Sequence, residues 1–258
     1  MLIADSQVHI WGADTPERPW PAGRAHQAQK PYPVTADMLL KEMDAAGVSR
    51  VVIVPPSWEG ERNDLGLEAA RLHPDRFAVM GRLALDRPES RALVADWRKQ
   101  PGMLGMRFTF HTDVYKPWLT DGTADWFWPA AEQASIPLML LMPGSLDILG
   151  RIATAHPKLK LALDHVGLRA TGKGAAAFAD LPAVLALAKA PERRGEGVRH
   201  ALALRQGLPF PRSPPVYQAA RRRVRAAPDV LGHRSHADAL HLPRVRLALH
   251  RGAALVER

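Results

Sequence analysis

Short apolar runs alternate with segments of helical apolar spacing through the first two-thirds of the chain. Short runs bounded by turn residues are typical of buried parallel strands, and helices connect such strands. The apolar runs predict six strands, over residues 2–7, 50–54, 77–83, 104–110, 137–142 and 159–164. The segments between them predict helices over residues 35–47, 63–72, 89–100, 126–134 and 146–156.

This alternation predicts an α/β fold with a parallel sheet. An open doubly wound sheet would carry a glycine-rich phosphate turn after its first strand, but Gln7-Val8-His9 stands at that position. The length of 258 residues suits a (β/α)8 barrel of the TIM type. We therefore expect such a barrel in incomplete form, with about six βα units followed by an irregular C-terminal segment.

The composition changes near residue 190. Residues 1–189 carry equal numbers of basic and acidic residues, whereas residues 190–258 hold 14 Arg, no Lys and 5 acids, which accounts for the whole net charge of +9. All seven Trp and all eight Met precede residue 190. We therefore expect a barrel portion over 1–189 and a poorly ordered Arg/Pro-rich segment over 190–258.

Several classes of protein do not fit this composition. The absence of cysteine excludes disulfides and thiolate metal sites. The start of the chain lacks the basic region of a signal peptide, and no apolar run approaches the roughly 20 residues of a membrane span. We expect a cytoplasmic protein that makes no membrane contact, while its oligomeric state stays open.

Polar side chains follow the first, fourth and sixth predicted strands. The first strand leads into Asp5, Gln7 and His9, and alternate residues of a strand share a face. The fourth strand contains Arg107, and the sixth ends in Asp164-His165. Barrel enzymes carry their chemistry at the carboxyl ends of the strands, so these side chains predict one shared site.

Each of these residues suits a chemical role and also a structural one. The imidazole of His165 can act as a general acid or base or bind a metal, or it can cap a helix. The guanidinium of Arg107 can hold a substrate carboxylate with two hydrogen bonds, or it can pair with a structural acid. Both alternatives remain open for both residues.

Three motifs together resemble the amidohydrolase-related branch of the amidohydrolase superfamily, over residues 1–189. They are Asp5-Ser-Gln-Val-His9-Ile-Trp, Gly-Met-Arg107 and Leu-Asp164-His165-Val-Gly167. The branch includes lactone hydrolases and decarboxylases that act on ring or ring-derived carboxylates.

The resemblance implies a (β/α)8 barrel and a small carboxylate or lactone substrate. It also implies roles for individual residues. His165 and Asp164 would be catalytic, and Arg107, Gln7 and Trp11 would bind the substrate.

The family's metal ligands are a His-x-His pair after strand one, a His after each of strands five and six, and an Asp after strand eight. His9 matches the second His of the pair and is the candidate metal ligand, but Gln7 replaces the first. Residues 137–144 contain no His, although His165 matches the strand-six ligand. One certain imidazole ligand of the usual three remains, which is too few for tight zinc binding. The chain therefore allows either a divalent metal such as zinc, or hydrolysis without metal in which His165 activates water and Arg107 holds a carboxylate.

The C-terminal segment reads as an out-of-frame translation. Reading the gene one base later turns residues 227–234 into Pro-Arg-Met-Phe-Trp-Gly-Thr-Asp when suitable synonymous codons are chosen. The same shift turns residues 192–199 into Asn-Val-Ala-Val-Lys-Ala-Ser-Ala, which is strand-like. These products resemble the eighth and seventh strands of the family, in the right order. We therefore expect the chain as written to leave the barrel open and to lack activity.

A second class of function depends on the same segment. Arg221, Arg222, Arg223 and Arg225 could neutralise nucleic-acid phosphates. Few aromatic residues accompany them and no binding module is recognisable, so this alternative is the weaker one. A non-catalytic scaffold is a third alternative, because the fold alone does not define a function.

Overall fold

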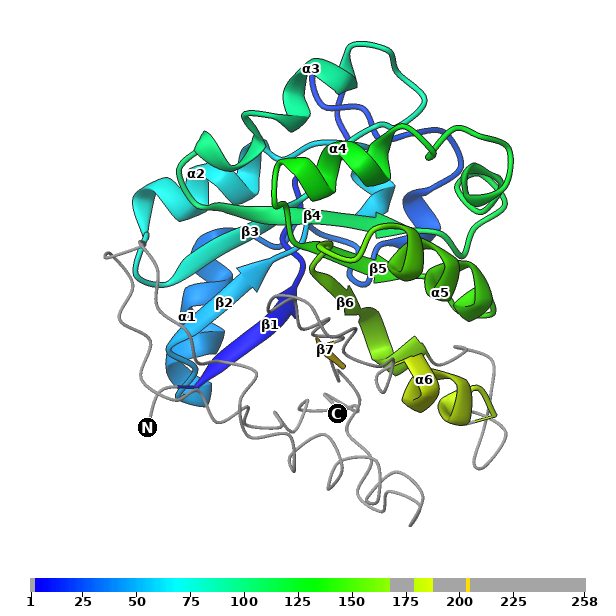
Figure 1. Cartoon of the computed structure of the whole chain (residues 1–258). Helices are drawn as coiled ribbons and strands as arrows, with labels where there is room; N and C mark the ends of the chain where they lie inside the picture. The colour runs from blue at the N-terminus through cyan, green and yellow to red at the C-terminus, as the bar shows by residue number, and fades with distance from the viewer. Residues whose placement is uncertain (1–2, 168–178, 188–202, 205–258) are drawn as a thin grey trace.

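The computed structural model describes residues 3–167, 179–187 and 203–204, and its centre is one parallel sheet. The strands lie side by side in the order of the chain (Figure 1). They are β1 (Ala4–Val8), β2 (Arg50–Ile53), β3 (Phe77–Gly81), β4 (Met103–Thr109), β5 (Leu138–Leu141), β6 (Leu161–Leu163) and β7 (Ala203–Leu204). Sequential parallel neighbours joined by helices are the pattern of a (β/α) barrel.

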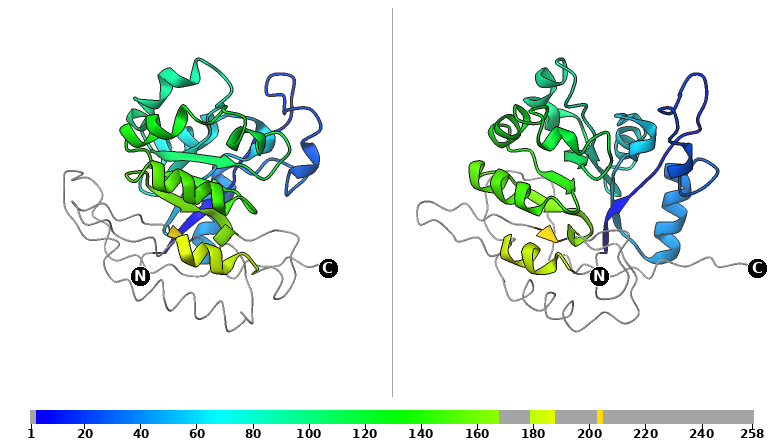
Figure 2. Two further views of the ribbon diagram at one scale, coloured as in Figure 1. Left: turned by 45° about the vertical axis from the view of Figure 1, so that its right-hand side comes forward. Right: turned by 90° about the vertical axis from the view of Figure 1, so that its right-hand side faces the viewer.

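The helices lie along the outer side of the curled sheet (Figure 2). They are α1 (Ala36–Ala46), α2 (Asp64–Leu72), α3 (Ser90–Val94), α4 (Phe127–Gln133), α5 (Leu146–Ala155) and α6 (Leu181–Leu187). Short 3-10 turns cover Ala25–Gln27, Ser57–Glu59, Trp97–Lys99, Pro117–Leu119 and Asp164–Gly167. Within the described ranges, no helix is long and apolar enough to cross a bilayer.

The start and end of α1 illustrate how local sequence sets these elements. Thr35 is the N-cap, and its side chain accepts a hydrogen bond from the backbone N–H of Met38. Gly47 ends the helix in the left-handed conformation, with φ of 69°. Leu39 and Met43, four residues apart, face the core. The sequence predicted both ends of this helix correctly.

The six predicted strands and the incomplete barrel are confirmed, with two differences. The helix predicted over 89–100 is divided into α3 and the 3-10 turn at Trp97–Lys99. The division lets the indole of Trp97 become buried and donate to the carbonyl oxygen of Gly105 at 2.9 Å. In addition, β7 pairs with β6 in the segment predicted to be irregular. The rest of that segment, including Arg221–Arg223 and Arg225, lies outside the described residues.

The two faces of the sheet carry different side chains. Val51 and Ile53 of β2 belong to the large apolar core between sheet and helices. Val54, Met80 and Met139 form a separate small cluster inside the barrel. The polar residues of the inner face therefore pack on this small apolar cluster.

A β-bulge in β1 changes which residues share a face. Asp5 pairs with Val51 and Val8 pairs with Ile53, so two residues of β1 lie opposite one residue of β2. The extra residue shifts the alternation, as bulges do. Asp5 consequently shares a face with Val51, the helix-covered side, whereas His9 turns to the interior. The strict alternation predicted for Asp5, Gln7 and His9 is therefore wrong, because the bulge includes Gln7.

Gly105 of β4 offers a test of this packing. An added Cβ would lie 2.2 Å from the backbone carbonyl oxygen of Pro137, which cannot move without disturbing β5. We expect Gly105→Ala to lower the free energy of unfolding by about 3 kcal/mol, measured by urea denaturation. Gly150→Ala is the control, because its Cβ would meet only the end of the Leu187 side chain, at 3.0 Å. Equal destabilisation by the two substitutions would contradict this account.

Candidate active site

The inner face of the sheet buries an ion pair near the carboxyl ends of β4 and β6. Arg107 pairs in register with Met139, which places it inside the barrel. Its Nε donates to Oδ2 of Asp164 at 3.1 Å, and its Nη1 donates to Oγ1 of Thr109. All three residues are buried. Arg107 thus has a buried carboxylate, that of Asp164, as its partner in this structure.

A second buried guanidinium lies beside the first. Arg82 follows β3, and its Nε and Nη2 donate to the two carboxylate oxygens of Glu61 at 3.1 and 3.3 Å. The side-chain amide of Asn63 holds the backbone of Arg82, accepting from its N–H at 2.7 Å and donating to its carbonyl at 2.9 Å. These two hydrogen bonds fix the backbone position of Arg82 at the end of β3.

Thr109 joins the two ion pairs. Its Oγ1 accepts a hydrogen bond from Nη1 of Arg82 at 3.2 Å as well as the one from Nη1 of Arg107. Burial lowers the pKa of Arg107, and the neighbouring Asp164 carboxylate opposes that shift. An arginine in a protein nevertheless keeps its charge. Two cations, two carboxylates and one hydroxyl therefore form a single network with no net charge.

His9 lies at the same end of the barrel. Its Nδ1 is 2.6 Å from the carbonyl oxygen of Val54, so Nδ1 carries the proton and Nε2 is left as the acceptor. Burial lowers the pKa of His9 to about 4, against the effect of the Val54 carbonyl. The positive charges of Arg107 and Arg82 lower it further, with a smaller contribution from His165. His9 is consequently neutral at physiological pH.

Two further histidines lie near these charges. His165 occupies the 3-10 turn after β6 in the left-handed region, with φ of 50°. Burial, opposed by Asp164 and assisted by Arg107, lowers the pKa of His165. His111, exposed at the rim after β4, has its pKa lowered by partial burial of the ring and then by Arg107, His165 and Arg82.

Together these groups define what the site can do. Neutral imidazoles can accept protons from water or a substrate, and the buried guanidiniums supply positive potential where anionic charge develops. A left-handed non-glycine residue such as His165 is uncommon, and such positions concentrate at functional sites. The arrangement suits acid–base chemistry on an anionic or polarised substrate.

Gln7 lies in β1, and Trp11 follows the carboxyl end of this strand. Trp11 is buried and packs edge to face on Trp58, at 5.4 Å between ring centroids, and Trp58 packs in the same way on His9, at 5.7 Å. Gln7 lies in the bulge, where its backbone N–H donates to Oδ1 of Asp5 at 3.0 Å. Substrate binding by Trp11, Gln7 and Arg107 stays a prediction, as do the catalytic roles of His165 and Asp164.

The same residues can be tested as a metal site. Among residues 3–167, 179–187 and 203–204, no group of three His, Asp or Glu side chains lies together as metal ligands do. His9 offers a free Nε2, but its nearest charges are the cations of Arg107 and Arg82. Oδ2 of Asp164 accepts from Arg107. Its buried Oδ1 has no hydrogen-bond partner among the described residues, and no second acidic or histidine ligand is grouped there with it and His9. The described side chains therefore do not fit a divalent cation bound by several ligands.

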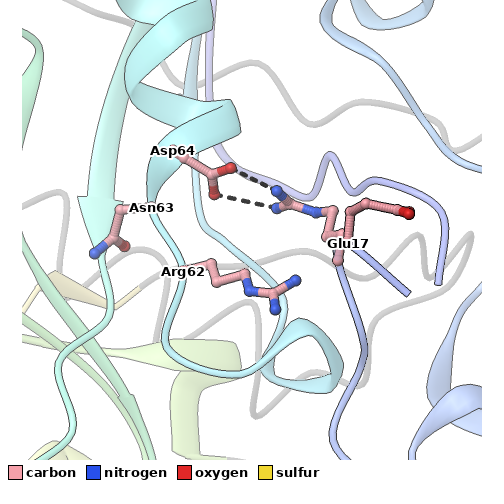
Figure 3. A pocket seen from close by; sticks show the side chains of 5 residues that line it. Glu17, Arg62, Asn63 and Asp64 are labelled. Atoms are coloured by element: carbon pink, nitrogen blue, oxygen red, sulfur yellow. Dashed lines mark hydrogen bonds and ion pairs between the residues drawn. The ribbon is translucent and has the colours of Figure 1, made fainter. Parts of the chain in front are cut away.

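A cavity of about 380 Å³ opens where the long loop after β1 meets the start of α2 (Figure 3). Glu17, Arg18, Arg62, Asn63 and Asp64 line it. Arg18 crosses it, donating from Nη2 to Asp64 at 3.1 Å and from Nε to the buried Glu59 at 2.9 Å. Asn63 connects this cavity with Arg82.

Sequence reasoning missed Arg82, Thr109, Glu61 and Trp58. A signal existed for Arg82, because it interrupts an apolar run after Gly81, and Arg107 interrupts the next apolar run two residues after Gly105. Glu61 and Trp58 lie in a loop, and nothing in their local sequence indicates which strand end they meet.

The chain belongs to the amidohydrolase family. The sequence profile of this family, described as "Amidohydrolase", matches residues 4–232. The matched range extends beyond residues 1–189, the part of the chain over which the motifs predicted the family resemblance. Among curated proteins, no match was found.

Solved structures share the fold at low sequence identity. A probable 2-pyrone-4,6-dicarboxylic acid hydrolase from Acinetobacter baumannii, with citric acid bound, is 20% identical with a TM-score of 0.55, over 72% of this chain and 66% of that one. An amidohydrolase from Burkholderia multivorans with bound zinc is 23% identical with a TM-score of 0.55, over 73% and 66%. A 5-carboxyvanillate decarboxylase from Novosphingobium aromaticivorans, complexed with manganese and a nitrobenzoic acid, is 17% identical with a TM-score of 0.50, over 64% and 65%. The chain thus matches just under two thirds of the length of these proteins.

The low pKa of His9 predicts a pH dependence of stability. Between pH 6.5 and 4 the unfolded chain binds a proton that folded His9 does not, so this contribution to stability is complete above pH 6.5 and is lost as the pH falls toward 4. We expect the free energy of unfolding to fall by about 1–2 kcal/mol on this account between pH 7 and pH 5. Urea denaturation at both pH values measures it.

His9→Asn retains a donor for the Val54 carbonyl and should remove most of this pH effect. The exposed His26, replaced by Asn, is the control and should leave the effect unchanged. A His9→Asn protein that loses stability with acid as steeply as the parent would contradict the assignment.

Proposed function

We propose that the chain derives from a hydrolase of small carboxylated lactones. The observation that carries the proposal is the convergence of His9 and His165 with the two buried guanidiniums at the carboxyl ends of four strands. The fold shared with a probable hydrolase of a pyrone dicarboxylic acid supports it. Positive potential from Arg82 and Arg107 suits a substrate that carries carboxylates.

The reaction begins with water held between the imidazoles and the ester carbonyl. His165 accepts a proton from the water through its ring, and the resulting hydroxide oxygen forms a bond to the carbonyl carbon. Nε2 of His9, the free acceptor, takes a hydrogen bond from the same water and orients it. The carbonyl π electrons move to oxygen, which becomes the oxyanion of a tetrahedral intermediate.

The intermediate then collapses to the open acid. The carbonyl re-forms, the ring C–O bond breaks, and His165 returns its proton to the departing ring oxygen. The guanidinium field of Arg82 and Arg107 lowers the energy of the oxyanion without reorganisation, because both side chains are already fixed by their partners. Asp164 holds Arg107 by a hydrogen bond, and its charge partly opposes the lowering of the pKa of the neighbouring His165.

The proposal needs no metal ion. Several structural neighbours hold zinc or manganese, but the described residues of this chain do not reproduce a ligand set of that kind. A water activated by neutral imidazole provides the nucleophile instead. Gln7, which stands in the place of a ligand, would then bind substrate by hydrogen bonds.

We further propose that residues 190–258 are an out-of-frame translation, and that the active protein carries the restored frame. The Arg-rich composition and the two family-like products of a one-base shift support this. In the restored frame, strands seven and eight would close the barrel around the site. Among the described residues β7 pairs with β6 over two residues only, and β1 is the other edge of the sheet. An exposed sheet edge favours aggregation.

Resequencing the gene tests the frame. We expect a one-base insertion or deletion near codon 190, with a downstream frame that encodes Gly-Thr-Asp. An intact gene whose synonymous variants keep the Arg-rich tail would show instead that the tail is selected.

Hydrolysis of lactones tests the activity. We expect the restored chain to open lactones of dicarboxylic acids, and the chain as written to be inactive toward them. His165→Ala should reduce kcat/KM by roughly 100-fold or more, because it removes the general base. His156→Gln at the end of α5, far from the strand ends, is the matched control and should keep the parent rate.

A chelator separates the two mechanisms. The restored chain should keep its rate of lactone hydrolysis after dialysis against EDTA. Proton release as the ring opens measures this rate. Complete loss on chelation, restored by zinc, would show that a metal supplies the nucleophile. A normal rate in His165→Ala would remove that residue from the mechanism.

A further inference from the structure

The long loop between β1 and α1 is connected to the buried charge network. Residues 12–33 form this loop, which we call the lid; it is drawn in blue and extends beyond the carboxyl end of β1 (Figure 2). Its base is closed by backbone hydrogen bonds between Trp11 and Val34 in both directions, at 2.9 and 3.1 Å. Arg18 fastens its middle to Glu59 and Asp64.

Arg24 makes a second attachment of the lid. Its Nη1 donates to the carbonyl oxygen of Ser57 at 2.7 Å and to the hydroxyl of Tyr115 at 3.1 Å. Tyr115 lies in the loop after β4 and is 8% exposed. The guanidiniums of Arg24 and Arg82 lie 5.2 and 5.8 Å from the centre of its ring, within the range of cation–π attraction.

The hydroxyl of Tyr115 has only one of its two hydrogen-bond partners, Glu61, to which it can donate. Arg24 can donate but cannot accept, so the Tyr115 oxygen accepts from it. Its own O–H then donates to Oε1 of Glu61, at 3.0 Å. The same Oε1 accepts from Nη2 of Arg82. Hydrogen bonds therefore connect the lid with Glu61 through Tyr115, and Arg82 donates to the same carboxylate from the other side.

The contacts continue from Arg82 to the proposed base. Arg82 and Arg107 share Oγ1 of Thr109, and Arg107 holds Asp164, which precedes His165. Tyr115 is the point at which the lid enters this network, since it contacts both Arg24 and Glu61. Its hydroxyl also shares the charge of Glu61, so that the carboxylate neutralises Arg82 less completely.

We propose that Tyr115 is a positioning residue that links closure of the lid to the placement of Arg82. With the lid closed, Arg24 fixes the phenol, the phenol fixes Glu61, and Glu61 holds Arg82 where its charge attracts an anionic ligand. The preference for anions rests on the proposed function. The link between lid and network does not.

Amide hydrogen exchange in the full chain tests the link. Tyr115→Phe removes the hydroxyl and keeps the ring, and Arg24→Met removes the donor. Each should speed exchange of residues 12–33 by roughly tenfold, because a hydrogen bond involving a charged partner is lost. The double variant should exchange no faster than the faster single variant, because both substitutions break the same connection.

Tyr32→Phe is the control, since Tyr32 is about half exposed. It should leave the exchange of the lid unchanged. Tyr115→Phe with parental exchange, or additive effects of Arg24→Met and Tyr115→Phe, would overturn the proposal.

Ligand affinity separates positioning from a general loss of structure. Calorimetry with phthalate, a dianion, should show binding weakened about tenfold in Tyr115→Phe, whereas neutral dimethyl phthalate should bind as it does to the parent. Equal weakening of both ligands would assign Tyr115 a merely structural role and overturn the proposal. A parent protein that ignores phthalate would contradict the anionic substrate, while the exchange measurement would still decide the link.

Discussion

The mouth of this barrel is organised by the need to compensate two buried guanidiniums. A charge removed from water is tolerated when it is paired and hydrogen-bonded, and removing one partner of such a pair costs several kcal/mol. Arg82 and Arg107 each hold one carboxylate, and Thr109 accepts from both. The acids come from the loop after β2 and the end of β6. The two ion pairs therefore fix the positions of these segments relative to β3 and β4.

The histidines depend on this arrangement. Burial is the main cause of the lowered pKa of His9 and His165, and the guanidiniums, which keep their charge, oppose protonation in the same direction. The result is a set of neutral bases next to permanent cations. That combination favours proton transfer from water and stabilises negative charge, and it disfavours a second, divalent cation at the same place.

The fold was largely predictable because buried parallel strands are short apolar runs with helices between them. Arg107, Asp164, His165 and His9 were found because strand ends in a barrel meet at one mouth. The bulge in β1 was not predictable, since nothing in the local sequence distinguishes it from a regular strand. Glu61 and Tyr115 were missed for another reason: their partners lie on other loops, and loop-to-loop contacts arise only once the sheet has formed.

The neutrality of the network has a consequence for how this sequence can diverge. If either acid is replaced by an uncharged residue, its arginine is left as an unpaired buried charge, which destabilises the fold. Replacing either arginine leaves its acid unpaired in the same way. Glu61 with Arg82, and Asp164 with Arg107, should therefore be inherited as couples, retained or replaced together. Thr109 serves both couples, so the hydroxyl at this position should outlast changes in either one.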